Sequence, residues 1–294
     1  MTKSDDYVLP GFMNLDRAGE GGHNAILMGA PGEGKTSLLE YLSVVAAKGR
    51  DIYGDKREPQ AGIWRARRHD RYLEFFGLNI GRLMLPQNSA YSLWKVYDDS
   101  RREEITVDEL EEAGLDYGFY TSPKSIVEQL EVGKILCILF PGDALEETRF
   151  YADLFEALVN RPTDEWVHIA IDEAGDILAP YNTDSYKVQK KFIDSVADFR
   201  KTNINSEVAC HSYTDLDYRI LPKMKYHIYK RGSKRMQGET KKIRQETINN
   251  TEKGEAWFTN GPFFDKLIFP EMKPDAKLDF KLQTVSRSMN VDVE

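Results

Sequence analysis

Short apolar runs alternate along this chain with longer stretches in which apolar side chains recur at helical spacing. The apolar runs predict buried strands at residues 24–28, 62–66, 134–140, 166–171, 207–210 and 225–230. The amphipathic stretches predict helices at residues 35–47, 146–159 and 185–202. Because strands that are apolar throughout are typical of parallel sheets, we expect an α/β fold with a mainly parallel sheet and helices on both faces.

The rest of the chain has a weaker pattern. Residues 77–121 carry many charges with little periodicity, so we expect a decoration of undefined structure there. Residues 255–269 predict a C-terminal β-hairpin that turns at Asn260-Gly261, a pair favoured in tight hairpin turns. We therefore predict a single domain over residues 1–270, followed by a polar tail over residues 271–294.

Composition and charge narrow the class of protein. The chain has 294 residues, of which 41% are hydrophobic and 30% charged, as in a soluble globular protein. No apolar run is long enough to span a membrane, and the polar residues 1–10 contain no secretory signal. Both cysteines, Cys137 and Cys210, lie in predicted strands, which favours a reducing compartment over disulfides or a metal site. The net charge of -8 argues against a protein that coats nucleic acid with its whole surface.

A motif between the first predicted strand and the first predicted helix indicates phosphate binding. It fits G-x-x-x-x-G-K-[ST], with Lys35 and Thr36 at its last two positions. Glycines let backbone N–H groups point at phosphate oxygens, the lysine reaches the β and γ phosphates, and the threonine hydroxyl can ligate Mg²⁺. The alternative is a Gly-rich turn that matches by chance, against which the order of strand, loop and helix argues. The expected nucleotide-binding residues are Gly29, Ala30, Pro31, Gly32, Glu33, Gly34, Lys35, Thr36 and Ser37.

Two carboxylates follow the predicted strand at residues 166–171. The carboxyl ends of parallel strands meet at one edge of a sheet, so we expect Asp172 to face Thr36 and to contribute to Mg²⁺ binding through water. We expect Glu173 to point away from Asp172 by strand alternation and to polarise a water in line with the γ phosphate. The pair favours hydrolysis over phosphoryl transfer to a metabolite. Alternatively, it is a solvated strand end before a turn at Gly175.

His211 follows the next predicted strand, at residues 207–210. A polar side chain at this strand end can hydrogen-bond the γ phosphate or its attacking water, so His211 is the candidate sensor of hydrolysis. A surface histidine at the end of a strand is the alternative, because histidine carries no motif of its own here.

Together these segments resemble the HerA/FtsK superfamily of ring-forming, DNA-pumping ATPases, which includes the genome-packaging ATPases of viruses with internal membranes. The resemblance covers roughly residues 20–232 and rests on residues 29–36, 168–174, 199–201, 209–212 and 215–220. It implies a RecA/ASCE-like P-loop NTPase fold, hydrolysis of ATP with Mg²⁺, and a homo-oligomeric ring, expected to be a hexamer. Members of the family have a glutamine at the sensor position, where this chain has His211.

The resemblance also implies that a neighbouring subunit contributes an arginine to the nucleotide site. Arg200 and Arg219 lie in family-like segments, and Arg231 is a third candidate. The sequence does not choose among them, and each is alternatively a surface arginine in an ordinary ion pair.

Two basic clusters are candidates for the phosphate contacts that a motor without sequence preference makes with double-stranded DNA. One contains Arg65, Arg67, Arg68 and Arg71, and the other, which we favour as channel-facing, contains Lys230, Arg231, Lys234, Arg235, Lys241, Lys242 and Arg244. The alternative for both is a solvated surface. The role that the resemblance implies is packaging of a DNA genome, with a capsid or membrane-vertex protein as a further partner. We expect a cytoplasmic protein, or a virion-associated one if the chain is viral.

Other functions share these motifs. A plasmid or conjugation-associated motor, or a Zot-like assembly ATPase, would need the same residues. A nucleotide-dependent switch or scaffold with little hydrolysis would need the phosphate loop but not Glu173. Residues 1–23 leave no room for an N-terminal barrel or membrane anchor before the first strand, so we expect a minimal motor from a virus or mobile element.

Overall fold

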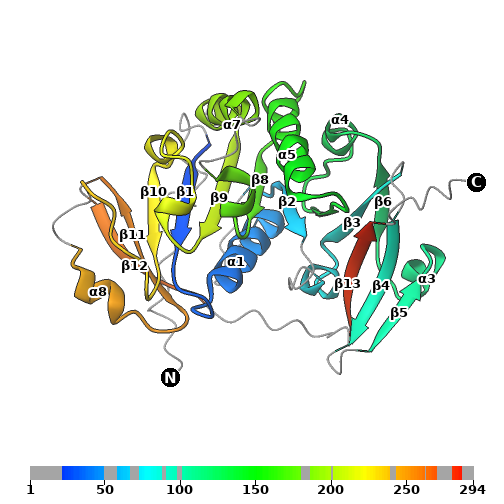
Figure 1. The fold of residues 1–294 in the computed structure, drawn as a ribbon, viewed down its shortest axis with the longest axis horizontal. Helices are drawn as coiled ribbons and strands as arrows, with labels where there is room; N and C mark the ends of the chain where they lie inside the picture. The colour runs from blue at the N-terminus through cyan, green and yellow to red at the C-terminus, as the bar shows by residue number, and fades with distance from the viewer. Residues whose placement is uncertain are drawn as a thin grey trace, which may run out of the picture.

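One large sheet organises the protein. A computed structural model describes residues 22–49, 58–66, 73–87, 91–97, 101–179, 186–199, 201–238, 243–261, 263–269 and 280–286. The strands of this sheet are β1 (Asn24–Met28), β2 (Ala61–Ala66), β3 (Gly81–Pro86), β6 (Tyr117–Tyr120), β7 (Ile135–Leu139), β8 (Val167–Ile171), β9 (Ile204–Cys210), β10 (Tyr226–Tyr229), β11 (Glu255–Asn260) and β12 (Phe263–Ile268). Within the described residues their order is β12-β11-β10-β1-β9-β8-β2-β7-β3-β6 (Figure 1). Every neighbouring pair from β10 to β6 is parallel. Strand β11 is antiparallel to both of its neighbours, β10 and β12.

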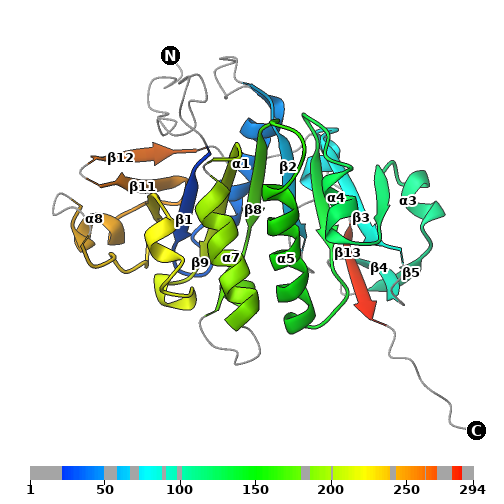
Figure 2. The same cartoon turned by 90° about the horizontal axis from the view of Figure 1, so that it is seen from above.

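Three long helices cover the two faces of this sheet. They are α1 (Lys35–Lys48), α5 (Ala144–Val159) and α7 (Tyr186–Phe199). Figures 1 and 2 show α5 and α7 together on one face and α1 on the other. The shorter helices are α2 (Glu74–Gly77), α3 (Asp108–Glu112), α4 (Pro123–Val127), α6 (Gly175–Leu178) and α8 (Gln245–Asn249), with 3₁₀ turns at Tyr213–Asp215 and Leu221–Lys223. The predicted α/β fold, with a mainly parallel sheet, helices on both faces and a C-terminal hairpin, is confirmed.

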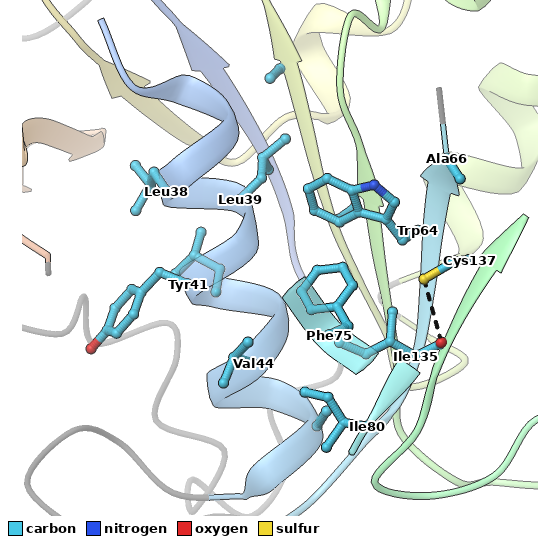
Figure 3. Packing of buried hydrophobic residues seen from close by; sticks show 14 of the residues in the cluster. Leu38, Leu39, Tyr41, Val44, Trp64, Ala66, Phe75, Ile80, Ile135 and Cys137 are labelled. Carbon is cyan, nitrogen blue, oxygen red and sulfur yellow. Dashed lines mark hydrogen bonds between the residues drawn. The ribbon is translucent and has the colours of Figure 1, made fainter. Parts of the chain in front are cut away.

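Separate apolar cores form on the two faces because side chains of successive strand residues point in opposite directions. On the α1 face, Leu39 of the helix lies beside Trp64 and Phe75, whereas Tyr41 points away from them (Figure 3) and stacks on Phe269. The Trp64 and Phe75 rings meet edge to face at 5.2 Å between centroids. On the other face, Phe155 of α5 contacts Phe192 of α7 edge to face and Phe199 of α7 at a tilt. Burial of each such aromatic side chain contributes about 1.5–3 kcal/mol, which fixes the helices against the sheet.

Helix α1 begins and ends at glycines in the left-handed conformation. Gly34, with φ of 82°, precedes the first turn, and Gly49, with φ of 55°, follows the last. A side chain at either position would oppose this backbone geometry, whereas glycine adopts it freely. The helix therefore starts directly after the phosphate-binding motif.

A second, three-stranded sheet was not predicted. It consists of β4 (Tyr91–Tyr97), β5 (Arg102–Ile105) and β13 (Phe280–Ser286), all antiparallel in the order β13-β4-β5. Leu93, Ile105 and Leu282 are buried and belong to the core on the α1 face.

Two expectations therefore differ from the structure. Residues 280–286 form a strand where a polar tail was expected, because pairing with β4 satisfies their backbone and buries Leu282. Within residues 77–121, β3 and β6 extend the central sheet and are not a decoration. Among the described residues, no helix is both long and apolar enough to cross a membrane. Cys137 and Cys210 are both buried.

Candidate nucleotide site

The topology of the sheet brings three loops to one edge. Strand β9 lies between β1 and β8 and is parallel to both, with Met28 opposite Cys210 and Ile171 opposite Val208. The loops that follow these strands therefore meet at their carboxyl ends. A cavity of about 540 Å³ opens there, lined by Pro31, Gly32, Gly34, Lys35, Thr36, Ser37, Glu173, His211, Lys253, Gly254 and Phe269.

The start of α1 faces this cavity with its backbone N–H groups available. Gly34 gives the helix no side-chain cap, and its first turn contains no acidic residue. The first N–H groups of a helix have no partner within the helix, and the helix dipole favours an anion beside them. A residue outside this loop holds Ala30 in place, because the Ala30 N–H donates to the Arg231 carbonyl at 2.9 Å. The loop thus fits a phosphate group in both geometry and charge.

Lys35 is held at the centre of the site. Its side chain is buried, and Nζ donates to the carbonyl oxygens of Gly29, at 3.0 Å, and Ala30, at 3.2 Å. A third contact joins Nζ to Nδ1 of His211 at 3.2 Å. The ammonium group is therefore already positioned inside the loop.

His211 connects Lys35 to Glu173. Its Nε2 lies 3.2 Å from a carboxylate oxygen of Glu173. An ammonium group can only donate, so Nδ1 accepts from Lys35. The structure therefore places these three predicted residues in one series of polar contacts beside the cavity.

Thr36 and Asp172 meet across the same edge. The Thr36 hydroxyl donates to Asp172 at 2.5 Å, and the other carboxylate oxygen of Asp172 accepts the Glu173 N–H at 2.9 Å. A hydroxyl and a carboxylate are hard oxygen donors of the kind that Mg²⁺ prefers. These two side chains therefore fit Mg²⁺ and would be the residues that hold it.

The backbone at Glu173 explains how the two carboxylates separate. Strand β8 ends at Ile171, so the expected strand alternation does not apply. Glu173 instead has a φ of 49°, in the left-handed region that side chains disfavour. The N–H of Ala174 then donates to Ala209 of β9 at 2.7 Å. A tight turn, rather than an extended strand, directs Asp172 to Thr36 and Glu173 to His211.

Arg65, expected in a DNA-binding cluster, is instead buried behind this turn. It is 1% exposed, and its Nε and Nη2 donate to the two carboxylate oxygens of Glu147 at 2.7 and 2.6 Å. Burial alone would lower its pKa, but the hydrogen bond to Glu147 and the charge of Glu147 outweigh burial and raise it. Its Nη1 donates to the carbonyls of Asp172 and Glu173, each at 3.1 Å. The remaining arginines of that cluster, Arg67, Arg68 and Arg71, lie outside the described residues.

Lys230, expected in the second cluster, is also buried. Its Nζ donates to the Glu255 carbonyl at 2.8 Å and lies 4.5 Å from the centroid of the Phe269 ring. A side chain built at Gly34 would approach Nζ to 3.7 Å, so the ammonium group lies just behind the phosphate loop. Burial lowers the pKa of Lys230 to about 8, against the opposing charges of Glu33 and Glu255. The exposed members of this cluster are Arg231, Lys234, Arg235 and Arg244, whereas Lys241 and Lys242 lie outside the described residues.

The three arginines considered for a neighbouring site have different environments. Arg200 lies outside the described residues. Arg219 is engaged within its own chain, by Asp217 at 2.5 Å and by Gln189 at 2.8 Å. Its hydrogen bond lowers the pKa of Asp217. Arg231 is exposed and follows the strand β10 directly beside the phosphate loop.

Several residues of the site were missed from sequence. Arg65 interrupts an apolar strand, and a charge inside such a run was a usable signal of a buried partner. Lys230 follows an apolar strand but also begins a basic run, so nothing in the sequence indicates that its side chain is buried. Lys253, Gly254 and Phe269 line the cavity from the two ends of the hairpin, and nothing local in the sequence marks them.

Comparisons with known proteins support the fold. No family model matches the chain, and no curated protein matches it. Among solved structures, VirB4 of Thermoanaerobacter pseudethanolicus is 12% identical with a TM-score of 0.51, covering 85% of this chain and 90% of that one. The genome packaging NTPase B204 from Sulfolobus turreted icosahedral virus 2, in complex with AMPPCP, is 12% identical with a TM-score of 0.49, covering 85% and 98%. The N-terminal domain of zonular occludens toxin from Neisseria meningitidis is 11% identical with a TM-score of 0.35, covering 86% and 96%. At such identities the similarity to VirB4 is one of fold: the chain has a P-loop NTPase fold with a mostly parallel central sheet and helices on both faces.

Proposed function

We propose that the protein is an ATPase whose hydrolysis of ATP drives translocation of double-stranded DNA. The observation that carries the proposal is the series of polar contacts Lys35–His211–Glu173, beside the Thr36–Asp172 pair, at the mouth of a cavity that begins at a helix N-terminus. A carboxylate in this position can accept a proton from a water that attacks the γ phosphate.

Each side chain has a role that follows from its contacts. Lys35 and the N–H groups of α1 bind the β and γ phosphates, while Thr36 and Asp172 hold Mg²⁺. Bound Mg²⁺ would neutralise charge on the phosphates. The Glu173 carboxylate accepts a proton from the attacking water. His211, hydrogen-bonded to Lys35 and 3.2 Å from the Glu173 carboxylate, senses whether the γ phosphate is present by exchanging one of these partners for it.

DNA is proposed as the substrate of translocation because exposed basic residues lie next to the phosphate loop. Arg231, Lys234 and Arg235 are exposed, and the Arg231 carbonyl is bonded to Ala30 of the loop. Contacts from such side chains to phosphates do not depend on sequence. In this proposal the protein acts as a homo-oligomeric ring, a hexamer, in which Arg231 is our choice for the arginine donated to a neighbouring site. Packaging of a viral genome, with a capsid or membrane-vertex partner, is the proposed setting.

Two substitutions with matched controls test the hydrolysis. Lys35→Ala should abolish binding of ATP, and Lys48→Ala, at the exposed far end of the same helix, should not. Glu173→Gln should retain ATP binding but lose hydrolysis by about 100-fold or more, whereas Glu165→Gln, exposed before the start of β8, should hydrolyse normally. Normal hydrolysis by the Glu173 variant would refute its assigned role.

The motor function has its own test. Duplex DNA should stimulate hydrolysis by the wild-type protein, and the stimulation should fall as salt is raised because counterion release weakens phosphate contacts. Stimulation should also fall in Lys234→Ala. Hydrolysis that no nucleic acid stimulates, in a preparation that forms rings, would refute DNA translocation and favour an assembly ATPase.

A further inference from the structure

We propose that Arg65 is a positioning residue for Glu173, holding the turn after β8 in the left-handed backbone conformation that directs the carboxylate to His211 and the cavity. The inference rests on the proposed function, since it assigns Arg65 a role in the same hydrolysis.

The backbone conformation of Glu173 is unfavourable and has to be stabilised by its surroundings. Its φ of 49° places Cβ against neighbouring backbone atoms, so an extended or helical backbone is the favoured state for a glutamate. In an extended strand, Glu173 would continue the alternation of β8 and would not take the present path toward His211. The structure around the turn must therefore hold the disfavoured state.

The contacts of Arg65 restrict the relevant torsions directly. Nη1 donates to the carbonyl oxygens of Asp172 and Glu173, both at 3.1 Å. These oxygens belong to the two peptide planes on either side of the Glu173 Cα. Because the relative orientation of those planes is set by the φ and ψ of Glu173, one nitrogen bonded to both oxygens restrains both torsions.

Arg65 is itself rigidly held. It lies on β2, whose neighbouring residue Trp64 is paired with Ala170 of β8, and the side chain is 1% exposed. The carboxylate of Glu147, on α5, binds the other edge of the guanidinium through two hydrogen bonds. Asp176 adds a contact at 3.7 Å. A planar guanidinium can satisfy a carboxylate with one edge and two carbonyls with the other, which a lysine cannot do.

Arg65→Lys is the variant of choice because it keeps the positive charge and changes only this geometry. We expect the rate of ATP hydrolysis at saturation to fall by about 10- to 100-fold, since a small misplacement of a catalytic group has effects of this size. The affinity for a non-hydrolysable ATP analogue should stay within about twofold of wild type. Arg82→Lys is the matched control, because Arg82 is also an arginine on a strand of the central sheet with an acidic partner, Asp116. That variant should hydrolyse ATP normally.

A measurement without nucleotide reports on the turn itself. The Asp176 N–H donates to the Glu173 carbonyl at 3.0 Å, so its hydrogen exchange is sensitive to the conformation of Glu173. In Arg65→Lys, peptides covering residues 172–178 should exchange about ten-fold faster, while peptides covering β1 should be unchanged. Glu147→Gln, which leaves Arg65 in place but weakens its anchor, should change both readouts in the same direction and by less.

A double variant separates positioning from a general structural effect. If Arg65 acts through Glu173, Arg65→Lys should add little to the loss already caused by Glu173→Gln in single-turnover measurements. Additive losses, a loss of affinity at unchanged hydrolysis rate, or unchanged exchange at residues 172–178 would each overturn the inference. A wild-type protein that does not hydrolyse ATP would overturn the proposed function itself, and this inference with it.

Discussion

Lys230 should make the stability of this protein rise with pH in the alkaline range. Its ammonium group is fully buried between the phosphate loop and the hairpin, with one hydrogen bond to a carbonyl and one aromatic ring beside it. Replacement by methionine removes the charge while keeping most of the side-chain volume. The comparison of wild type with Lys230→Met therefore isolates the energetic effect of burying this amine.

The magnitude follows from the pKa of Lys230. Burial lowers it from 10.5 to about 8 in the folded protein, so between these two values the unfolded chain binds more protons than the folded one. The free energy of unfolding then rises with pH across this window and is flat below it. A difference of 2.5 pH units at about 1.4 kcal/mol per unit corresponds to a gain of about 3 kcal/mol. Below pH 8 the cost of burying the charge is fully present.

Urea unfolding followed by tryptophan fluorescence at pH 7, 8, 9 and 10 would measure this effect. The free energy of unfolding of the wild type, minus that of Lys230→Met, should rise with pH by about 2–3 kcal/mol over this range. Lys234→Met, at an exposed position of the same segment, is the control and should give a difference that does not vary with pH. A flat difference for Lys230→Met as well would show that the amine is not desolvated, and the argument from burial would be wrong.

Three further predictions concern the core, a buried charge cluster and the metal site. Leu282→Ala should lower the free energy of unfolding by about 2–5 kcal/mol in urea unfolding, because Leu282 is fully buried on β13; a loss under about 1 kcal/mol would place β13 outside the core. The Glu207 carboxylate and the His168 ring are both buried and lie 3.1 Å apart. Burial lowers the pKa of His168; burial would raise the pKa of Glu207, but the neighbouring His168 and His23 outweigh it and lower that pKa. Both shifts make the folded state bind fewer protons, so stability should fall as pH drops below the ordinary histidine value of 6.5 and again below the ordinary glutamate value of 4.5. Because Glu207 raises the pKa of His168, Glu207→Gln should flatten only the lower part of this dependence in acid unfolding. Thr36→Val should weaken the Mg²⁺-dependent part of ATP binding by about 10-fold or more while leaving the thermal unfolding midpoint unchanged; equal binding with and without Mg²⁺ in both proteins would count against the assigned ligand.

The central sheet was predictable because its strands are buried on both faces. The run at residues 134–140 contains β7, Ile135–Leu139, whose side chains are all buried, so every position had to be apolar. The same logic located β8 and β9 to within a few residues. Local sequence was sufficient to locate these strands because a strand buried on both faces is apolar at nearly every position.

The second sheet was not predictable for the opposite reason. Strand β5, Arg102–Ile105, buries only its last residue and exposes three charged ones. Strand β13 pairs with β4, which lies far earlier in the chain, with Gln283 opposite Trp94. Strands that are polar on one face and paired with distant partners carry no local signal strong enough to separate them from loops.

The site divides in the same way. The residues expected from motifs, Lys35, Thr36, Asp172 and Glu173, lie together because each follows a strand that the apolar pattern located: Lys35 and Thr36 begin the helix after β1, and Asp172 and Glu173 come directly after β8. The left-handed turn at Glu173 was not predicted, since it depends on hydrogen bonds from Arg65 of β2 to the Asp172 and Glu173 carbonyls. Sequence therefore located the candidate residues, and tertiary contacts determine their geometry.

Two buried basic side chains lie close to the candidate nucleotide site. Arg65 and Lys230 were both expected to contact DNA, yet Arg65 donates to two main-chain carbonyls of the turn after β8, and Lys230 donates to the Glu255 carbonyl at the start of β11. Such carbonyls lie where strands end and the sheet no longer supplies partners, so an unsatisfied oxygen would be costly. A charged side chain can reach them, and its own burial is offset by Glu147 for Arg65 and in part by Glu33 and Glu255 for Lys230. Removing these two from the candidate DNA surface leaves the exposed basic residues that follow β10, of which Arg231 accepts a hydrogen bond from Ala30 of the phosphate loop through its carbonyl. A DNA contact at that position would pull directly on the loop that binds the phosphates, and this is the mechanical link that a translocating ATPase needs.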